Sequence, residues 1–174
     1  MKEIKTSYYA NLKNIDTKIW TPIAISGDEG KLVGFNELAF RQLSPYVFFK
    51  SWKAEEDRLE QSYNLGFISK EEYEIGKERN RQIYIEKFYN KVLIKLNVKE
   101  IYDSLPNKSV LLCFEKPTEF CHRFLVAGWL EYFLNLQVDE LGYENDGRVL
   151  ENTKALKSMI ISQFEIDEID KEIK

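Results

Sequence analysis

One apolar run, residues 110–113, constrains the fold more than any other segment. Its residues, Val-Leu-Leu-Cys, show no polar alternation, which is typical of a strand that is covered on both faces of a sheet. A polar loop follows, and then a largely apolar helix is predicted over residues 119–136, with Thr118 as its cap. A short strand over residues 137–141 would complete a strand–helix–strand unit with parallel strands. The pattern predicts an α/β fold with a small, mainly parallel sheet flanked by helices.

The chain length of 174 residues fits a single domain over residues 1–174. Residues 4–10 and 19–26 are rich in β-formers and predict two more strands. Pro22 favours a sheet edge or a strand start for the second of them, because proline cannot donate a ladder hydrogen bond. At the other end, an amphipathic helix is expected over residues 153–164 and a flexible tail over residues 165–174.

A long helical insertion is predicted in the middle of the domain, over residues 53–97. A charged helix over residues 54–63 precedes Gly66, which can terminate it. Ser69-Lys70-Glu71-Glu72 is a capping box that opens a second helix, expected to reach about residue 96. A short helix over residues 98–105 should then stop before Pro106.

Aromatic residues in and before this insertion leave two questions open. Four of them, Tyr46, Phe48, Phe49 and Trp52, either line a pocket or belong to the core, and the large area that aromatic rings bury favours the core. A second stripe, Tyr84, Phe88 and Val92, lies on one helix face. It either covers the sheet or carries a homodimer contact.

Composition excludes several broad classes of protein. The formal net charge of −4 argues against a general electrostatic grip on nucleic acid or on anionic lipid. Two cysteines do not make a disulfide scaffold, and the first residues lack the apolar stretch of a signal peptide. No run is long enough to span a bilayer. We therefore expect a cytoplasmic protein with free thiols and no membrane partner.

Reactive side chains gather directly after the apolar run. Cys113 ends the predicted strand, Glu115 follows it, and Cys121, His122 and Arg123 open the predicted helix. The set holds both cysteines and the only histidine of the chain. Since ligands of open α/β sheets bind at the carboxyl ends of the strands, this motif predicts a site there, facing Ser7 and Tyr8 at the end of the first strand.

The residue types favour an anion site that is also capable of catalysis. Arg123, Lys116 and the free amides of a helix start suit a phosphate group, although Arg123 could instead pair with Glu119 one turn before it. The helix dipole and Arg123 should lower the pKa of the Cys121 thiol, whereas burial should raise the pKa of Cys113. His122 and Glu115 are candidate acid–base groups. Each of these side chains also has a plain structural explanation, as a packed thiol or a capping histidine.

A zinc site is not expected from the spacing. Cys113, Cys121 and His122 are suitable ligand types, but no paired cysteines and no second histidine are present. Adjacent helical residues point about 100° apart, so Cys121 and His122 should not share one metal. Neither a metal nor another cofactor is predicted.

The motif resembles a known family. Leu111-Leu112-Cys113-Phe114-Glu115, followed by Cys121-His122-Arg123, is similar to the motif of the bacterial family catalogued as domain of unknown function 488, and residues 6–10 resemble the opening strand of that family. The resemblance implies that Cys113, Glu115 and 121–123 are motif positions, with Ser7 and Tyr8 on the opening strand. It implies no particular reaction.

The leading functional hypothesis is a protein that binds a small phosphate-bearing molecule, a nucleotide or a nucleic-acid end, with catalysis on it left open. The first alternative is a non-catalytic interaction protein whose cysteines, histidine and arginine are structural. The second is a thiol-based enzyme. A catalyst should expose Cys121 or His122 in a cleft, whereas the structural alternative buries both.

Overall fold

A parallel four-stranded sheet forms the centre of the computed structural model, which describes residues 1–149, 151, 154, 157–158 and 161–162. The strands are β1 (Ile4–Tyr8), β2 (Thr21–Ala24), β3 (Ser109–Cys113) and β4 (Val138–Glu140), in the order β2-β3-β1-β4. All three pairings are parallel, and the ends of β1 and β3 coincide, with Tyr8 opposite Cys113. The predicted α/β class with a parallel sheet is confirmed, and Pro22 lies in the edge strand β2.

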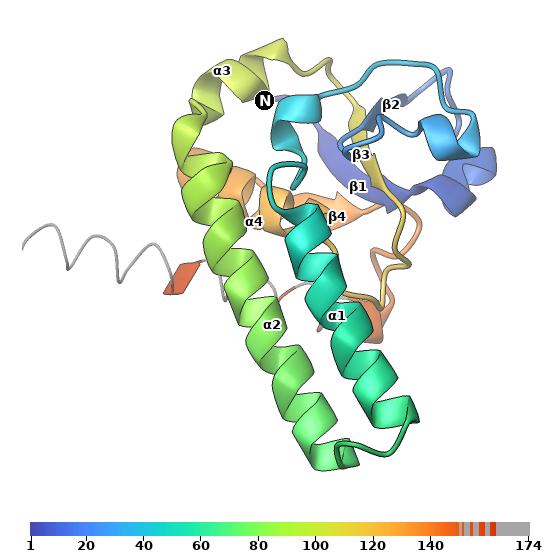
Figure 1. Ribbon diagram of the computed structural model, residues 1–174. Coiled ribbons are helices and arrows are strands. Elements are labelled where there is room, and N and C mark those ends of the chain that lie inside the picture. The colour runs from blue at the N-terminus through green and yellow to red at the C-terminus, as the bar shows by residue number, and fades with distance from the viewer. Residues whose placement is uncertain (150, 152–153, 155–156, 159–160, 163–174) are drawn as a thin grey trace, which may run out of the picture.

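The labelled α-helices lie on one side of this sheet, and the last of them packs directly on its strands (Figure 1). They are α1 (Phe49–Asn64), α2 (Lys70–Lys91), α3 (Val98–Ser104) and α4 (His122–Leu134). Their apolar faces form the main core together with alternate residues of the strands, such as Ile23, Leu111 and Cys113. The intervening strand residues, such as Ala24 and Leu112, face a smaller core on the other side.

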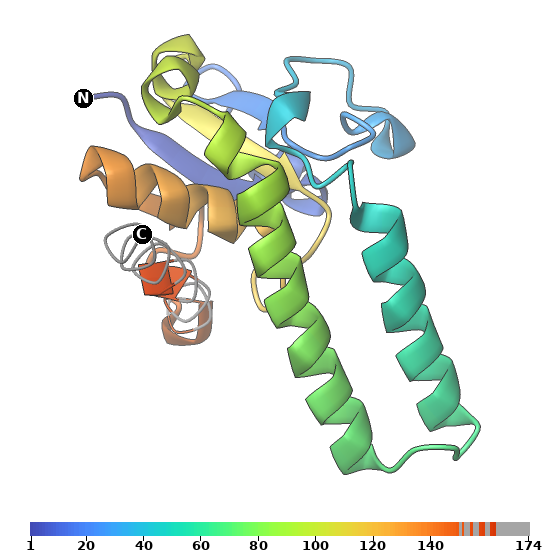
Figure 2. The ribbon, with the colours of Figure 1, turned by 60° about the vertical axis from the view of Figure 1, so that its left-hand side comes forward.

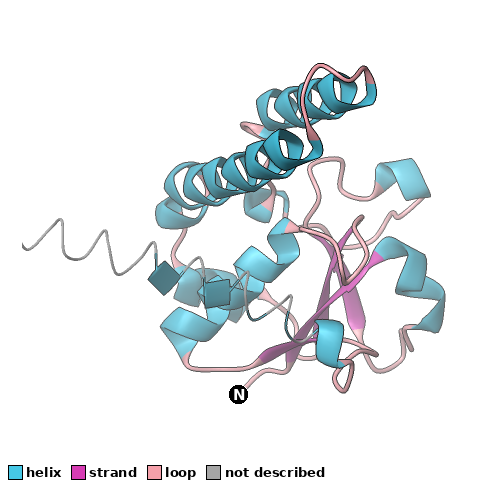
Figure 3. Ribbon diagram, turned by 90° about the horizontal axis from the view of Figure 1, so that it is seen from below, coloured by secondary structure: helices cyan, strands magenta, loops and turns pink. Residues whose placement is uncertain are grey.

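Short 3-10 helices and loops cover that second face. The 3-10 helix η1 (Tyr9–Asn14) contributes Tyr9, and the loop after β2 contributes Phe35. Three further 3-10 turns connect the elements: η2 (Lys31–Val33), η3 (Arg41–Leu43) and η4 (Leu93–Lys95). Figure 3 shows the sheet set apart from the two long helices, with shorter helical turns around its edges.

The predicted helical insertion is the antiparallel pair α1 and α2, whose distal end projects beyond the sheet (Figure 2). Gly66, with φ of 74°, closes α1: its N–H donates to Tyr63 O, and the Phe67 N–H donates to Ser62 O. Ser69 and Glu72 make both hydrogen bonds of the capping box that opens α2. Both turns follow the sequence prediction.

The aromatic stripe of α2 belongs to the core. Tyr84, Phe88 and Val92 are all buried in the main core with residues of the sheet and of α4, which agrees with the first of the two alternatives, that the stripe covers the sheet. A homodimer through another surface stays a prediction. Earlier in the chain, Phe48 is buried as expected, but Tyr46 and Phe49 are exposed.

Several boundaries differ from the predicted ones. The helix α4 begins at His122 and not at residue 119, and α2 ends at Lys91, where η4 takes over. Residues 147–149, 151, 154, 157–158 and 161–162 are helical, whereas the rest of the predicted helix over 153–164 and the tail over 165–174 lie outside the described residues. Within the described part, no helix combines the length and apolar character that a membrane crossing requires.

Candidate functional site

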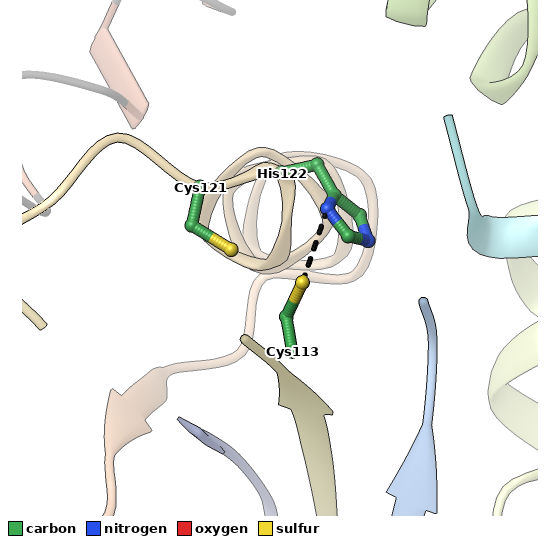
Figure 4. A group of neighbouring side chains, drawn as sticks. All are labelled: Cys113, Cys121 and His122. Carbon is green, nitrogen blue, oxygen red and sulfur yellow. Dashed lines mark hydrogen bonds between the residues drawn. The ribbon is translucent and has the colours of Figure 1, made fainter. Parts of the chain in front are cut away.

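Three potential ligand atoms converge where β3 ends and α4 begins (Figure 4). Cys113 is the last residue of β3 and points toward α4, on the same face as Leu111. Cys121 is the N-cap residue of α4, with extended backbone (φ −150°), and His122 is its first helical residue. The two sulfurs and one ring nitrogen of His122 all lie within 4.8 Å of one another, and all three residues are buried.

The imidazole of His122 is held in one orientation. Its Nε2 lies 3.0 Å from the carbonyl oxygen of Ile25, just after β2. Because a carbonyl only accepts, Nε2 carries the proton and donates it to Ile25. The other nitrogen, Nδ1, therefore faces the Cys113 sulfur at 3.5 Å, as Figure 4 shows. The ring also packs edge-on against Phe88.

The geometric argument against a shared metal is wrong for this chain. It assumed that Cys121 and His122 both lie inside a helix and so point about 100° apart. Cys121 instead precedes the helix in extended conformation, and its side chain turns back toward His122 and Cys113. The same boundary removes the predicted cap at Thr118.

Glu115 lies beside the cluster. The Cys113 thiol donates to the Glu115 carboxylate, with 3.2 Å between Sγ and Oε2. Burial, together with the charge on Cys121, raises the pKa of Glu115 to about 7. A carboxyl group with such a pKa can exchange a proton near neutral pH.

The two thiols differ in acidity in the predicted direction. Burial by itself would raise the pKa of Cys121, but the neighbouring Cys113 thiol and the charges of Arg123 and His122 lower it well below its usual range. Burial raises the pKa of Cys113, and the neighbouring Cys121 raises it further. The pKa of His122 is raised as well, because Cys121 and Glu115 outweigh the desolvation of the ring.

Arg123 does not face a ligand. Its side chain is 0% exposed, and two of its nitrogens, Nε and Nη2, donate to Glu140 at 3.2 and 3.1 Å. A third nitrogen, Nη1, donates to the carbonyl of Glu115 at 2.7 Å, and Thr6 donates to the same Glu140 carboxylate. Each of its three nitrogens therefore already donates to a protein acceptor, and Arg123 does not line the cavity described below, so the prediction that Arg123 binds a phosphate gains no support.

The other predicted anion ligands lie away from the cluster. The side chain of Lys116 is exposed, and its backbone N–H donates to Glu119 in the loop before α4. Ser7 is buried and accepts a hydrogen bond from Asn11. As an alternate residue of β1, Ser7 faces away from Thr6 and from α4. Tyr8 meets Tyr143 beyond β4, with 3.0 Å between the hydroxyls. Ser7 therefore faces away from the Cys121 turn, whereas Tyr8 lies on the α4 face of β1 and its hydroxyl is engaged by Tyr143.

A cavity of about 810 Å³ opens over the cluster. Cys113, Glu115, Cys121 and His122 line it at one end. Seven aromatic residues form much of the remaining wall: Tyr46, Phe48, Phe49, Trp52, Tyr84, Phe114 and Phe120. Cys121 and His122 are only 2% and 4% exposed, as the structural alternative predicted, yet both contribute to the cavity wall.

Two components of the site were not predicted, and a third was considered but not preferred. The Ile25 carbonyl carries no side-chain signal, so the sequence could not reveal it. Glu140 is an acidic residue within a short predicted strand. Because a buried carboxylate is normally paired, its position in that strand was the available signal that a cationic side chain lies next to it. The aromatic wall was recognised as a possible pocket, but the core interpretation was preferred for all four residues from Tyr46 to Trp52.

Comparison with protein-family models, with curated proteins and with solved structures found no match. The resemblance to domain of unknown function 488 therefore stays a prediction.

Proposed function

We infer that this protein binds a small molecule carrying a flat aromatic ring, namely the nucleobase of a nucleotide or of a nucleic-acid end, and acts on it at the Cys–His–Glu cluster. The observation that carries the proposal is a single cavity with an aromatic wall and a reactive end. Cavities of roughly 300–1,000 Å³ with a few convergent polar groups are typical small-molecule sites.

The aromatic wall is rigid enough to hold a ring. Trp52 packs edge-on against Tyr84, with ring centroids 4.9 Å apart, and its indole N–H donates to Asn80 O at 3.2 Å. Phe49 and Phe120 contact the same indole. Stacking of a base on such a surface contributes roughly 1–3 kcal/mol and tolerates any base.

Polar groups at the cavity edge suit the remainder of a nucleotide. Lys50, in the first turn of α1, is exposed and lines the cavity, so it replaces Arg123 as the candidate partner of a phosphate. Asp28 also lines the cavity, and hydrogen bonds from Ser26, Leu32 and Gly30 outweigh its partial burial and lower its pKa. The resulting carboxylate is suited to accept hydrogen bonds from sugar hydroxyls.

Fluorescence of Trp52 provides the binding test. We expect nucleosides and nucleotides to quench it in the wild type, and Trp52→Phe should abolish this change. Tyr46→Ala removes a ring that is 60% exposed and should weaken binding about tenfold, a factor equal to 1.4 kcal/mol. Phe67→Ala, at the projecting tip of the α1–α2 pair, is the matched control and should bind normally.

Two further comparisons test the phosphate and the reaction. Lys50→Gln should weaken binding of a nucleotide and leave binding of the matching nucleoside unchanged. Incubation of bound compounds with wild type and with His122→Gln, followed by mass spectrometry, tests turnover. Absence of quenching by any base, nucleoside or nucleotide would contradict the proposal and favour the structural interpretation of the cluster.

A further inference from the structure

We propose that Cys113, Cys121 and His122 bind a Zn²⁺ ion whose fourth coordination position faces the aromatic cavity. The three donor atoms come from the end of β3 and from the start of α4, and they lie within 4.8 Å of one another. Two thiolates and one imidazole are a donor set that selects zinc among the common divalent cations.

The spacing of one donor pair matches tetrahedral coordination. Zinc bonds of about 2.3 Å to sulfur and about 2.0 Å to nitrogen place two such ligands about 3.5 Å apart. Cys113 Sγ and His122 Nδ1 are separated by 3.5 Å. This pair therefore needs no movement to share an ion.

The outer contacts of His122 are those of a metal ligand. Histidines that bind metals usually donate the other ring N–H to a carboxylate or a backbone carbonyl, which fixes the ring and its tautomer. Here Nε2 donates to Ile25 O at 3.0 Å, which directs Nδ1 at the sulfurs. Phe88 packs against the ring and limits its rotation.

The charges also balance around such an ion. Two thiolates neutralise Zn²⁺, and the nearby guanidinium of Arg123 is already neutralised by Glu140, with 3.1 Å between the closest atoms. Binding would displace the thiol protons, so the site loads only with reduced cysteines.

The position of the ion suggests what it would supply. All three donors line the cavity together with Glu115, so the fourth position is open to a water molecule from that side. Zinc lowers the pKa of a bound water toward neutrality, and the Glu115 carboxylate could accept the proton. Only this last step rests on the proposed function, since the ion itself needs no ligand in the cavity.

Cobalt binding gives a direct test, because the chain contains two cysteines and one histidine in all. We expect untagged protein, kept reduced with a phosphine, to bind one equivalent of Co²⁺ with thiolate charge-transfer absorption, and Zn²⁺ to displace it. Cys113→Ser and Cys121→Ser should each lose much of that absorption, and these variants and His122→Gln should bind at least about a hundredfold more weakly. Glu119→Gln, in the same loop, is the control and should bind like the wild type.

Thiol alkylation covers the case in which a variant does not fold. In the wild type, Zn²⁺ should protect both cysteines from a maleimide, and a chelator should restore their reaction. Reduced protein that reacts at both thiols and shows no thiolate band with Co²⁺ would overturn the proposal and favour thiol chemistry. Quenching of Trp52 fluorescence by nucleosides and nucleotides is measured separately on metal-free protein. Absence of metal binding and absence of nucleobase binding therefore give different results.

Discussion

His122 and Arg123 are neighbours in the sequence, yet their side chains lie in two regions with opposite properties. On one side of the first turn of α4, Arg123, Glu140 and Thr6 form a closed hydrogen-bonded group, which we call the paired side. On the other, Cys113, Cys121 and His122 direct their atoms at one another beside a cavity, which we call the donor side.

The difference shows that two adjacent residues of a short motif can have unlike surroundings, one in a closed ion pair and one beside a cavity. On the paired side, all three nitrogens of the buried Arg123 guanidinium donate to protein oxygens, so the group is held inside the fold. Its charge nevertheless acts on the donor side, because it helps to lower the pKa of Cys121. A charge that is fixed in place can influence a site without contacting any ligand.

The largest effect should come from breaking the paired side. Arg123→Met leaves the Glu140 carboxylate buried without its partner, and we expect a loss of about 3–5 kcal/mol in the free energy of unfolding. Chemical denaturation measures this loss. Lys116→Met, a change of an exposed cation in the same motif, should alter stability by less than about 0.5 kcal/mol.

A double variant sharpens the same comparison. Arg123→Met combined with Glu140→Leu removes both charges, so much of the lost stability should return. Cobalt should still bind to this variant, because the donor side is intact. If the single Arg123 variant is as stable as the wild type but no longer binds nucleotides, Arg123 contacts the ligand and the division into two sides is wrong.

The sequence could predict those features that depend on local chemistry. The unbroken apolar run identified β3, and the capping box and Gly66 identified the ends of the helical pair, because each follows from residues within one turn or strand. The clustering of Cys113, Cys121 and His122 at a strand end also followed from the parallel fold.

Features that depend on tertiary contacts could not be predicted. Glu119 seemed a suitable helical partner for Arg123, but it lies before α4 and accepts the backbone N–H of Lys116 instead. The real partner, Glu140, reaches Arg123 because β4 pairs with β1, a pairing that no local pattern reveals. A shift of three residues in the helix start also moved Cys121 out of the helix and brought its thiol to His122.

The next effect concerns the donor side and depends on pH. The pKa of Glu115 is about 7 in the folded protein, against an ordinary value of 4.5. The folded state therefore holds the Glu115 proton more tightly than the unfolded state does. The stability that this protonation contributes is lost as pH rises from about 4.5 to 7. In metal-free protein, Glu115→Gln should stabilise the fold above pH 7 by an amount on the order of 2 kcal/mol.

Unfolding at pH 5 and pH 8 tests this prediction. The difference in stability between Glu115→Gln and wild type should grow toward pH 8, whereas Glu119→Gln should show no such growth. An equal difference at both pH values would mean that Glu115 is not held in its protonated form.

A smaller effect is expected at Ser7, which lies on the far face of β1. Ser7→Ala removes the acceptor of the Asn11 side chain, at 3.1 Å, and should cost about 1 kcal/mol of unfolding free energy. Because Ser7 belongs to neither side, cobalt binding and Trp52 quenching should not change. If a folded Ser7→Ala variant loses cobalt binding or Trp52 quenching, Ser7 contributes to the site as first predicted.

The smallest effect should come from Tyr8, which tests how far the paired side extends. Tyr8→Phe removes a partly buried hydroxyl contact with Tyr143 next to β4, and we expect a loss of at most about 0.5–1 kcal/mol. Tyr143→Phe removes the same contact from the other side and should cost a similar amount, so the double variant should lose little more than either single one. Nucleotide binding should be unaffected in all three variants, since neither Tyr8 nor Tyr143 lines the cavity. If Tyr8→Phe weakens binding of a nucleotide and Tyr143→Phe does not, the hydroxyl of Tyr8 turns to the ligand, and the opening strand contributes to the site as the family resemblance implied.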